Sequence, residues 1–280
     1  MTERLRTSVV VVGDEILGGF VEDTNSRWLA RRLQRLGIPL ERIVTVPDER
    51  AAIGEAIVAE LSRSRPRVLL TSGGIGSTPD DLTLESVAAA IGVGVVRQPE
   101  IDERITEALE WSAERGVDIT EGHETSMRRM ALVPDGAYLL PGARGIAPGI
   151  AVDVDGGSSA QAGATIVVLP GIPSELERIV INGVEPALLA GRGVVQHVAE
   201  LTHPYPESVL NPVLERLVRE FEDVHVGSYP GAQCLVRLEG ARERVEPAFA
   251  LLREAVDALD ADPGLQRLRD AWQARARSRA

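Results

Sequence analysis

A glycine-rich segment ending in two adjacent acids, residues 71–81, is the first place where residue types and spacing suggest chemistry. It follows an apolar run at 68–70 and precedes apolar residues at helical spacing over 83–91, so the order is strand, loop, helix. Such a loop directs backbone N–H groups at one point, which favours anions, above all phosphate. The two acids would repel a phosphate unless a divalent cation lay between them. The alternative is an ordinary β–α turn with Asp81 or Thr83 as the helix N-cap.

Acidic loops also follow two earlier strands. The valine run at 8–12 leads into Gly13-Asp14-Glu15 and a loop to residue 19, and the strand predicted at 42–46 leads into Pro47-Asp48. Helices are predicted after both strands, over 26–36 and 49–63, the first of them opened by Asp23-Thr24-Asn25. Alternating strands and helices indicate a doubly wound, mostly parallel α/β sheet in three layers. Because ligands of such sheets lie beyond the carboxyl ends of the strands, we expect these loops to form one site.

The rest of the chain extends this pattern. Helices are predicted over 99–115 and 121–130, and residues 149–154 and 164–169 are predicted to pair as a hairpin around a turn at 155–163. Pro170-Gly171-Ile172-Pro173-Ser174-Glu175 then forms a second strand-to-helix loop, with a helix to about residue 189. Strands and helices resume after a composition change near 191–193. We predict three parts, which are 1–190, a smaller α/β domain over 194–262 and an Arg-rich tail over 263–280.

The net charge of −12 excludes several functions. An acidic chain lacks the basic face that neutralises nucleic-acid phosphates, so no nucleic-acid partner is expected. All 30 basic residues are arginines, which excludes mechanisms that depend on lysine. The one cysteine, Cys234, excludes an intrachain disulfide and a cysteine-cluster metal site. No apolar run resembles a signal peptide or a membrane span, so we expect a cytoplasmic protein without a membrane partner.

Three motifs in chain order carry a resemblance to a known family. They are Gly13-Asp14-Glu15 with Asn25, the segment 72–83, and Pro170-Gly171-Ile172-Pro173-Ser174-Glu175. Residues 7–190 resemble the molybdopterin-binding (MoaB/Mog-like) domain family, and within it the N-terminal region of competence/damage-inducible protein A. The glycine loop departs from the family pattern, because Ser77 stands where proline is usual and Pro79 lies one place before the acids.

The resemblance implies a function and a set of residues. It implies a homo-oligomer, a dimer or a trimer, and in the competence-protein branch a metal-dependent pyrophosphatase acting on ADP-ribose. Asp48 and Asp81, assisted by Asp80, would hold a divalent cation such as Mg²⁺, and Glu15 or Asp14 would orient or deprotonate the attacking water. The expected ligand or phosphate contacts are Gly13, Asp14, Asn25, Ser72, Gly73, Gly74, Gly76, Ser77, Thr78, Pro170, Gly171, Pro173, Ser174 and Glu175.

Two kinds of alternative stay open. Asp48, Asp81, Asn25 and Ser174-Glu175 could be helix caps, and an N-cap is the commoner fate of an aspartate such as Asp48 that follows a strand. In the molybdenum-cofactor branch the resemblance implies binding or adenylylation of molybdopterin instead, with molybdopterin as the ligand. A non-catalytic binding module would use the same pocket without turnover.

Overall fold

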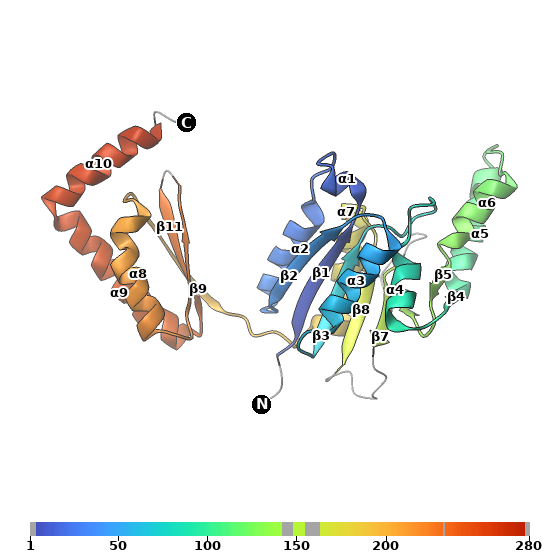
Figure 1. The fold of residues 1–280 in the computed structure, drawn as a ribbon, viewed down its shortest axis with the longest axis horizontal. Coiled ribbons are helices and arrows are strands. Elements are labelled where there is room, and N and C mark those ends of the chain that lie inside the picture. Colours follow the sequence, from blue (N-terminus) through green and yellow to red (C-terminus); the bar gives the residue numbers. More distant parts are fainter. Residues whose placement is uncertain (1–3, 142–147, 155–162, 232, 278–280) are drawn as a thin grey trace. The chain divides into compact units, whose positions relative to one another are not determined.

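The chain folds into two compact units, Met1–Val195 and Gln196–Ala280 (Figure 1). The computed structural model describes residues 4–141, 148–154, 163–231 and 233–277. The turn predicted at 155–163 therefore lies outside the described residues except for Gly163. The first unit contains the candidate site.

A six-stranded sheet in the order β2-β1-β3-β8-β7-β6 forms the centre of the described part of the first unit. Its strands are β1 (Arg6–Val12), β2 (Leu40–Val46), β3 (Arg67–Ser72), β6 (Tyr138–Leu139), β7 (Ile150–Val154) and β8 (Ala164–Leu169). The strands β2, β1, β3 and β8 are parallel, whereas β7 pairs antiparallel with both β8 and β6. Because β2 and β3 lie on opposite sides of β1, the chain reverses its direction of travel across the sheet at β1.

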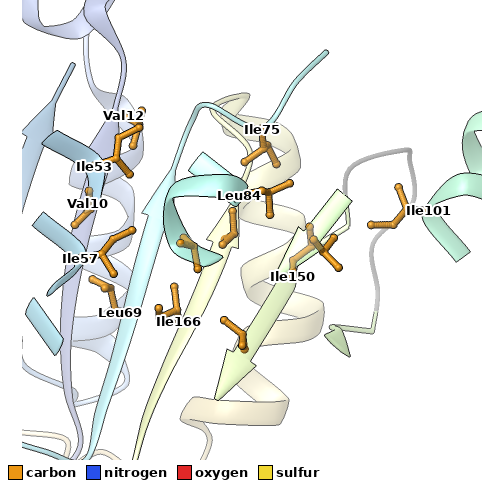
Figure 2. Packing of buried hydrophobic residues seen from close by; sticks show 14 of the residues in the cluster. Val10, Val12, Ile53, Ile57, Leu69, Ile75, Leu84, Ile101, Ile150 and Ile166 are labelled. Atoms are coloured by element: carbon orange, nitrogen blue, oxygen red, sulfur yellow. The ribbon is translucent and has the colours of Figure 1, made fainter. Parts of the chain in front are cut away.

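Helices cover both faces of this sheet. They are α2 (Thr24–Arg35), α3 (Arg50–Leu61), α4 (Thr83–Ile91), α7 (Pro173–Ile179) and the π-helix η1 (Val180–Leu189), whereas the short helix α1 (Asp14–Leu17) directly follows the end of β1. Because strand side chains alternate between faces, Val10 and Leu69 pack with Ile53 and Ile57 of α3 (Figure 2), whereas Val9 and its neighbours on that face pack with α2, α7 and η1. Continuous apolar strands buried on both faces are typical of parallel sheets.

A group of two short strands and two helices lies between α4 and β6 in the chain. It consists of β4 (Val95–Arg97), α5 (Pro99–Ala113), α6 (Glu121–Arg129) and β5 (Leu132–Pro134), with β4 and β5 paired antiparallel. Ile101, Ile105 and Leu109 of α5 belong to the same buried cluster as α3 and α4. The two helices were predicted, but the two three-residue strands were not.

The second unit is a three-stranded antiparallel sheet with helices. Its elements are β9 (His197–His203), α8 (Glu207–Glu220), β10 (His225–Tyr229), β11 (Cys234–Gly240), α9 (Arg242–Ala261) and α10 (Pro263–Arg277). Inward residues alternate with exposed ones on β9 and with half-buried ones on β11, and the inward residues pack with α8 and α9. The predicted Arg-rich tail contains the helix α10.

The predicted fold class is confirmed, because the first unit is a three-layer, mostly parallel α/β sheet and a smaller α/β unit follows it. The hairpin of β7 and β8 is also confirmed. Among the described residues, no helix combines the length and apolar character needed to span a bilayer.

Candidate functional site at the carboxyl edge of the sheet

The loops that follow β1, β2, β3 and β8 leave the sheet at its carboxyl edge, because these four strands are parallel. Each of the three predicted motifs, together with Asp48, lies in one of these connections, at the strand end, in the loop or in the first turn of the helix that follows it. This is the edge at which doubly wound sheets bind their ligands.

Asp48 lies at the centre of a group of acids. Its Oδ2 accepts a 2.8 Å hydrogen bond from the backbone N–H of Asp14, which ties the end of β2 to the end of β1. Burial raises the pKa of the Asp48 carboxyl, the Asp14 N–H opposes this, and the negative charges of Glu15, Asp14 and Asp80 raise it further. The structure therefore brings acids from three different loops together. Asp48 does not cap α3, whose N-cap is Glu49.

Gly13 and Glu15 form the β1 side of this group. A side chain at Gly13 would overlap Glu15, since a Cβ there would lie 2.6 Å from Glu15 Oε1. Residues 14–17, predicted as part of a loop, form the short helix α1, none of whose residues is buried. The turn is held by backbone bonds such as Gly18 N–H to Asp14 O at 2.8 Å. The Glu15 carboxylate thus lies beside Gly13 at the start of the loop.

The glycine loop after β3 is shaped by its own contacts. Gly73 and Gly74 have φ values of 101° and 65°, in the left-handed region that favours glycine. A Cβ on Gly73 would lie 2.3 Å from Val12 O, so only glycine lets β3 leave the sheet this close to β1. Thr83, predicted as an alternative N-cap of α4, instead donates its hydroxyl to Gly73 O at 2.8 Å. Thr83 therefore fixes the backbone of the glycine loop. In the sequence, the position of Thr83 at the start of a predicted helix is the one feature that could have indicated this role.

Asp81 and Asp80 have separate roles in this loop. Asp81 Oδ2 accepts hydrogen bonds from the backbone N–H and the hydroxyl of Thr78, at 2.7 and 2.6 Å. Its carboxylate closes this turn and does not cap α4, whose N-cap position is Leu82 with no capping side chain. The nearby Thr78 side chain, followed by a backbone N–H, lowers the pKa of Asp80. Asp80, and not Asp81, is the loop acid whose charge raises the pKa of Asp48.

Asn25 links the ends of β3 and β8. Its Nδ2 donates to Ser72 Oγ at 3.0 Å and to Gly171 O at 2.8 Å. Asn25 is buried and is not the cap of α2, since Asp23 accepts the N–H of Ser26 at 2.9 Å. A Cβ on Gly171 would lie 3.5 Å from Gly73 Cα, so the β3 and β8 loops are in contact. Asn25 therefore positions two loops of the site.

We expect Asn25→Ala to lower the free energy of unfolding by about 1–3 kcal/mol, because Ser72 Oγ and Gly171 O lose their donor and the bond to Ser72 is buried. Urea unfolding measures this change. The matched control is Asn182→Ala, which removes a surface bond from Asn182 Nδ2 to Arg178 O and should stay within about 0.5 kcal/mol of the unaltered chain. Equal stability of the two variants would contradict the linking role.

The remaining residues that were expected to contact the ligand follow β3 or β8 in the chain. Gly76 adjoins the Asp81 carboxylate, because a Cβ there would lie 2.7 Å from Asp81 Oδ2. Pro173 is the first residue of α7. The other residues of this set differ in exposure: Pro170 is buried, Ser77 and Glu175 are half-buried, and Thr78 and Ser174 are exposed.

The structure also bears on the predicted metal. Within the described ranges, no three carboxylate, imidazole or thiolate side chains are arranged to hold a metal ion. The acids near Asp48 are close enough to shift its pKa, but they do not form a ligand set by themselves. A metal held by protein side chains alone does not fit this arrangement, so the divalent cation stays a prediction.

The sheet order, the two covered faces and the polar carboxyl edge define a doubly wound α/β domain whose site lies at the strand ends. Residues 8–190 match the family model described as "Probable molybdopterin binding domain". A protein of Aeropyrum pernix is 35% identical over 274 residues, which cover 92% of this chain and 96% of that protein. The chain belongs to this molybdopterin-binding domain family.

Two further relatives bear on the predicted branch. A CinA-like protein of Trichormus variabilis is 38% identical over 175 residues, or 62% of this chain and 38% of that protein. The solved structure of the protein CinA from Thermoplasma acidophilum, described as of unknown function, is similar with a TM-score of 0.51 and 28% identity. It covers 63% of this chain and 94% of that one. The resemblance predicted from the three motifs is confirmed.

Proposed function

We propose that the carboxyl edge of the sheet binds a ligand that contains a pyrophosphate group. The protein would hydrolyse the pyrophosphate bond of a nucleotide sugar such as ADP-ribose. Water would attack one phosphorus atom and break the bridging P–O bond, which leaves AMP and ribose 5-phosphate. A carboxylate would take the proton that the water loses.

The position of Asp48 is the observation that carries this proposal. A general base works best when its pKa lies nearer the working pH than that of an ordinary carboxylate. Burial and three neighbouring acids raise the pKa of Asp48, while the Asp14 N–H keeps its carboxyl in one place. We assign the base role to Asp48, with Glu15 and Asp14 orienting the water beside it.

The glycine loop suits the phosphate end of such a ligand. Gly74 and Gly76 are half-buried beside the edge, and α4 begins at Thr83. The first turn of a nine-residue helix supplies partial positive charge to an anion. Because the acids near this loop are negative, we also propose that the reaction needs a divalent cation. The ligand and the two acids of the glycine loop, Asp80 and Asp81, would bind this cation jointly.

Incubation of the purified protein with ADP-ribose tests this function. We expect AMP and ribose 5-phosphate to form with Mg²⁺ and to stop forming when the ion is chelated. Release of neither product with Mg²⁺ or Mn²⁺, while a pterin binds, would refute the hydrolase proposal.

Asp81→Asn is expected to remove turnover without unfolding the chain. The amide oxygen of asparagine can still accept the two Thr78 bonds, so the turn should persist while the charge is lost. Product release measures activity, and circular dichroism with thermal melting measures the fold. A fully active Asp81→Asn protein would remove Asp81 from the proposed cation site.

The family match favours a second function, since the matched model describes a molybdopterin-binding domain. Molybdopterin also carries a phosphate beside a planar heterocycle, so the same edge would bind or adenylylate it. A thermal-shift comparison of nucleotide sugars and pterins, with and without Mg²⁺, separates the two functions, because a selective ligand raises the melting temperature.

A further inference from the structure

Phe20 is an exposed aromatic ring on the turn that carries two acids of the site. It is 87% exposed, and its neighbours Leu17 and Val21 are 53% and 51% exposed. Single exposed apolar residues are common on protein surfaces. Several of them on one short turn beside a candidate site call for an explanation.

The backbone holds this ring in a defined place. The carbonyl of Glu15 accepts the N–H groups of Phe20 and Val21, at 2.9 and 3.1 Å. Gly19 N–H donates to Ile16 O at 3.1 Å, which closes the same turn. Glu15, one of the acids near Asp48, therefore also fixes the position of Phe20 through its backbone carbonyl.

The ring of Phe20 lies close to Gly18. A Cβ on Gly18 would lie 2.6 Å from Cε2 and 2.8 Å from Cδ2 of Phe20, so one edge of the ring occupies the space that a side chain at residue 18 would fill. Despite this contact at one edge of the ring, Phe20 as a whole is 87% exposed. This arrangement leaves a ring face free for a planar partner.

The other phenylalanines have different environments. The chain has three, and Phe221 and Phe249 pack against the core of the second unit. Guanidinium groups of Arg244 and Arg253 lie 5.1 and 5.0 Å from the centres of those two rings. Phe20 belongs to none of the buried clusters found among the described residues.

We propose that Phe20 is the stacking surface for the planar heterocycle of the ligand whose phosphates lie at the carboxyl edge. This inference rests on the proposed binding function and names the part of the ligand that the acids and the glycine loop do not recognise. Stacking on an aromatic ring suits a purine or a pterin, because any flat π-face can take part. Phe20 would determine that the protein prefers ligands with a heterocycle over bare pyrophosphate.

Equilibrium binding to the full chain, measured by calorimetry, tests this proposal without requiring turnover. The probes are ADP-ribose, a pterin and inorganic pyrophosphate, which lacks a heterocycle. We expect Phe20→Ala to weaken binding of at least one heterocyclic probe about tenfold or more while pyrophosphate affinity stays within about twofold. Phe20→Trp should retain binding. Trp111→Ala, which removes a 57% exposed ring on α5, is the matched control and should change neither.

Several results would overturn the proposal. They are unchanged affinity of Phe20→Ala for both heterocyclic probes, an equal loss for all three probes, and an unaltered chain that binds neither heterocycle. A change in oligomeric state of Phe20→Ala by light scattering, with unaltered ligand binding, would make the ring a subunit contact instead. Binding of ADP-ribose that depends on Phe20 without any hydrolysis would refute only the hydrolase reaction.

Discussion

Asp48→Asn is expected to lower the turnover of ADP-ribose by about 10²–10⁴-fold, the usual contribution of a general base. The same variant should be more stable than the unaltered chain at neutral pH. The introduced asparagine can still accept the N–H of Asp14 through its amide oxygen, so the link between β1 and β2 should remain. A loss of activity together with a gain of stability is typical of a residue retained for function.

The sign of the stability change follows from the pKa of Asp48. This pKa is raised in the folded chain above its ordinary value of 3.8, so the folded state binds the proton more tightly than the unfolded state does. The ionised carboxylate therefore destabilises the fold at pH values above the raised pKa, and this cost disappears below the ordinary value. The stability gain of Asp48→Asn should be largest near neutral pH and should vanish in acid.

Thermal melts from acid to neutral pH and the initial rate of AMP release measure these two effects. The matched control is Asp118→Asn, which neutralises an exposed acid between α5 and α6 and should change neither quantity. An active Asp48→Asn protein, or one that is less stable at neutral pH, would contradict the role given to Asp48.

Arg67→Met is expected to lower the free energy of unfolding by about 3–5 kcal/mol, the largest stability effect that we predict. Arg67 begins β3 and is 1% exposed. It donates to Glu41 Oε2 at 2.6 Å, to Ser8 Oγ at 2.5 Å and to Ser64 O at 3.2 Å. Its Nη1 also lies 3.9 Å from the buried carboxylate of Glu60. Methionine would keep most of the volume but would leave both acids with less compensation.

Glu60 makes this loss severe. It is 1% exposed, and neither of its carboxylate oxygens has a hydrogen-bond partner among the described residues. Its charge is balanced by guanidinium groups of Arg42, Arg63 and Arg67, at 3.4, 3.5 and 3.9 Å. Removing a buried charge partner costs more than the pair contributes, because the other charge stays buried.

The pH dependence of this effect has the opposite sign to that of Asp48. Burial alone would raise the pKa of Glu41, but the hydrogen bond and charge of Arg67, with Arg6 and Arg63, lower it below the ordinary value of 4.5. The ionised Glu41 thus stabilises the fold above that value, and the contribution is lost as the pH falls through the lowered pKa. The difference between the unaltered chain and Arg67→Met should therefore shrink in acid.

Urea unfolding at several pH values measures the Arg67 effect. Arg6→Met is the matched control, because Arg6 pairs with the same Glu41 at 3.1 Å from a partly exposed position. An exposed pair of this kind contributes at most about 1 kcal/mol. If the two variants lose the same stability, burial is not the reason for the Arg67 effect.

Periodicity and residue type alone determined much of this protein. The valine run of β1, the apolar run of β3 and the helical spacing of Ile53 and Ile57 each predict an element, because a face that packs against a core must be apolar at the period of its backbone. Alternation of these elements then places the acidic and glycine-rich loops at one edge. The three-layer fold and the location of the candidate site follow from these local patterns.

Tertiary structure decided which atoms meet at that edge. The sequence suggests Asp48 as a helix cap, yet its carboxylate accepts an N–H from Asp14, 34 residues away. It also does not separate Asp80 from Asp81, whose directions depend on how Thr78 closes the turn. The burial of Arg67 depends on Glu41 and Glu60, brought together only by strand pairing and helix packing. Contacts between residues distant in the chain leave no periodic signal, because they depend on how the elements pack in three dimensions.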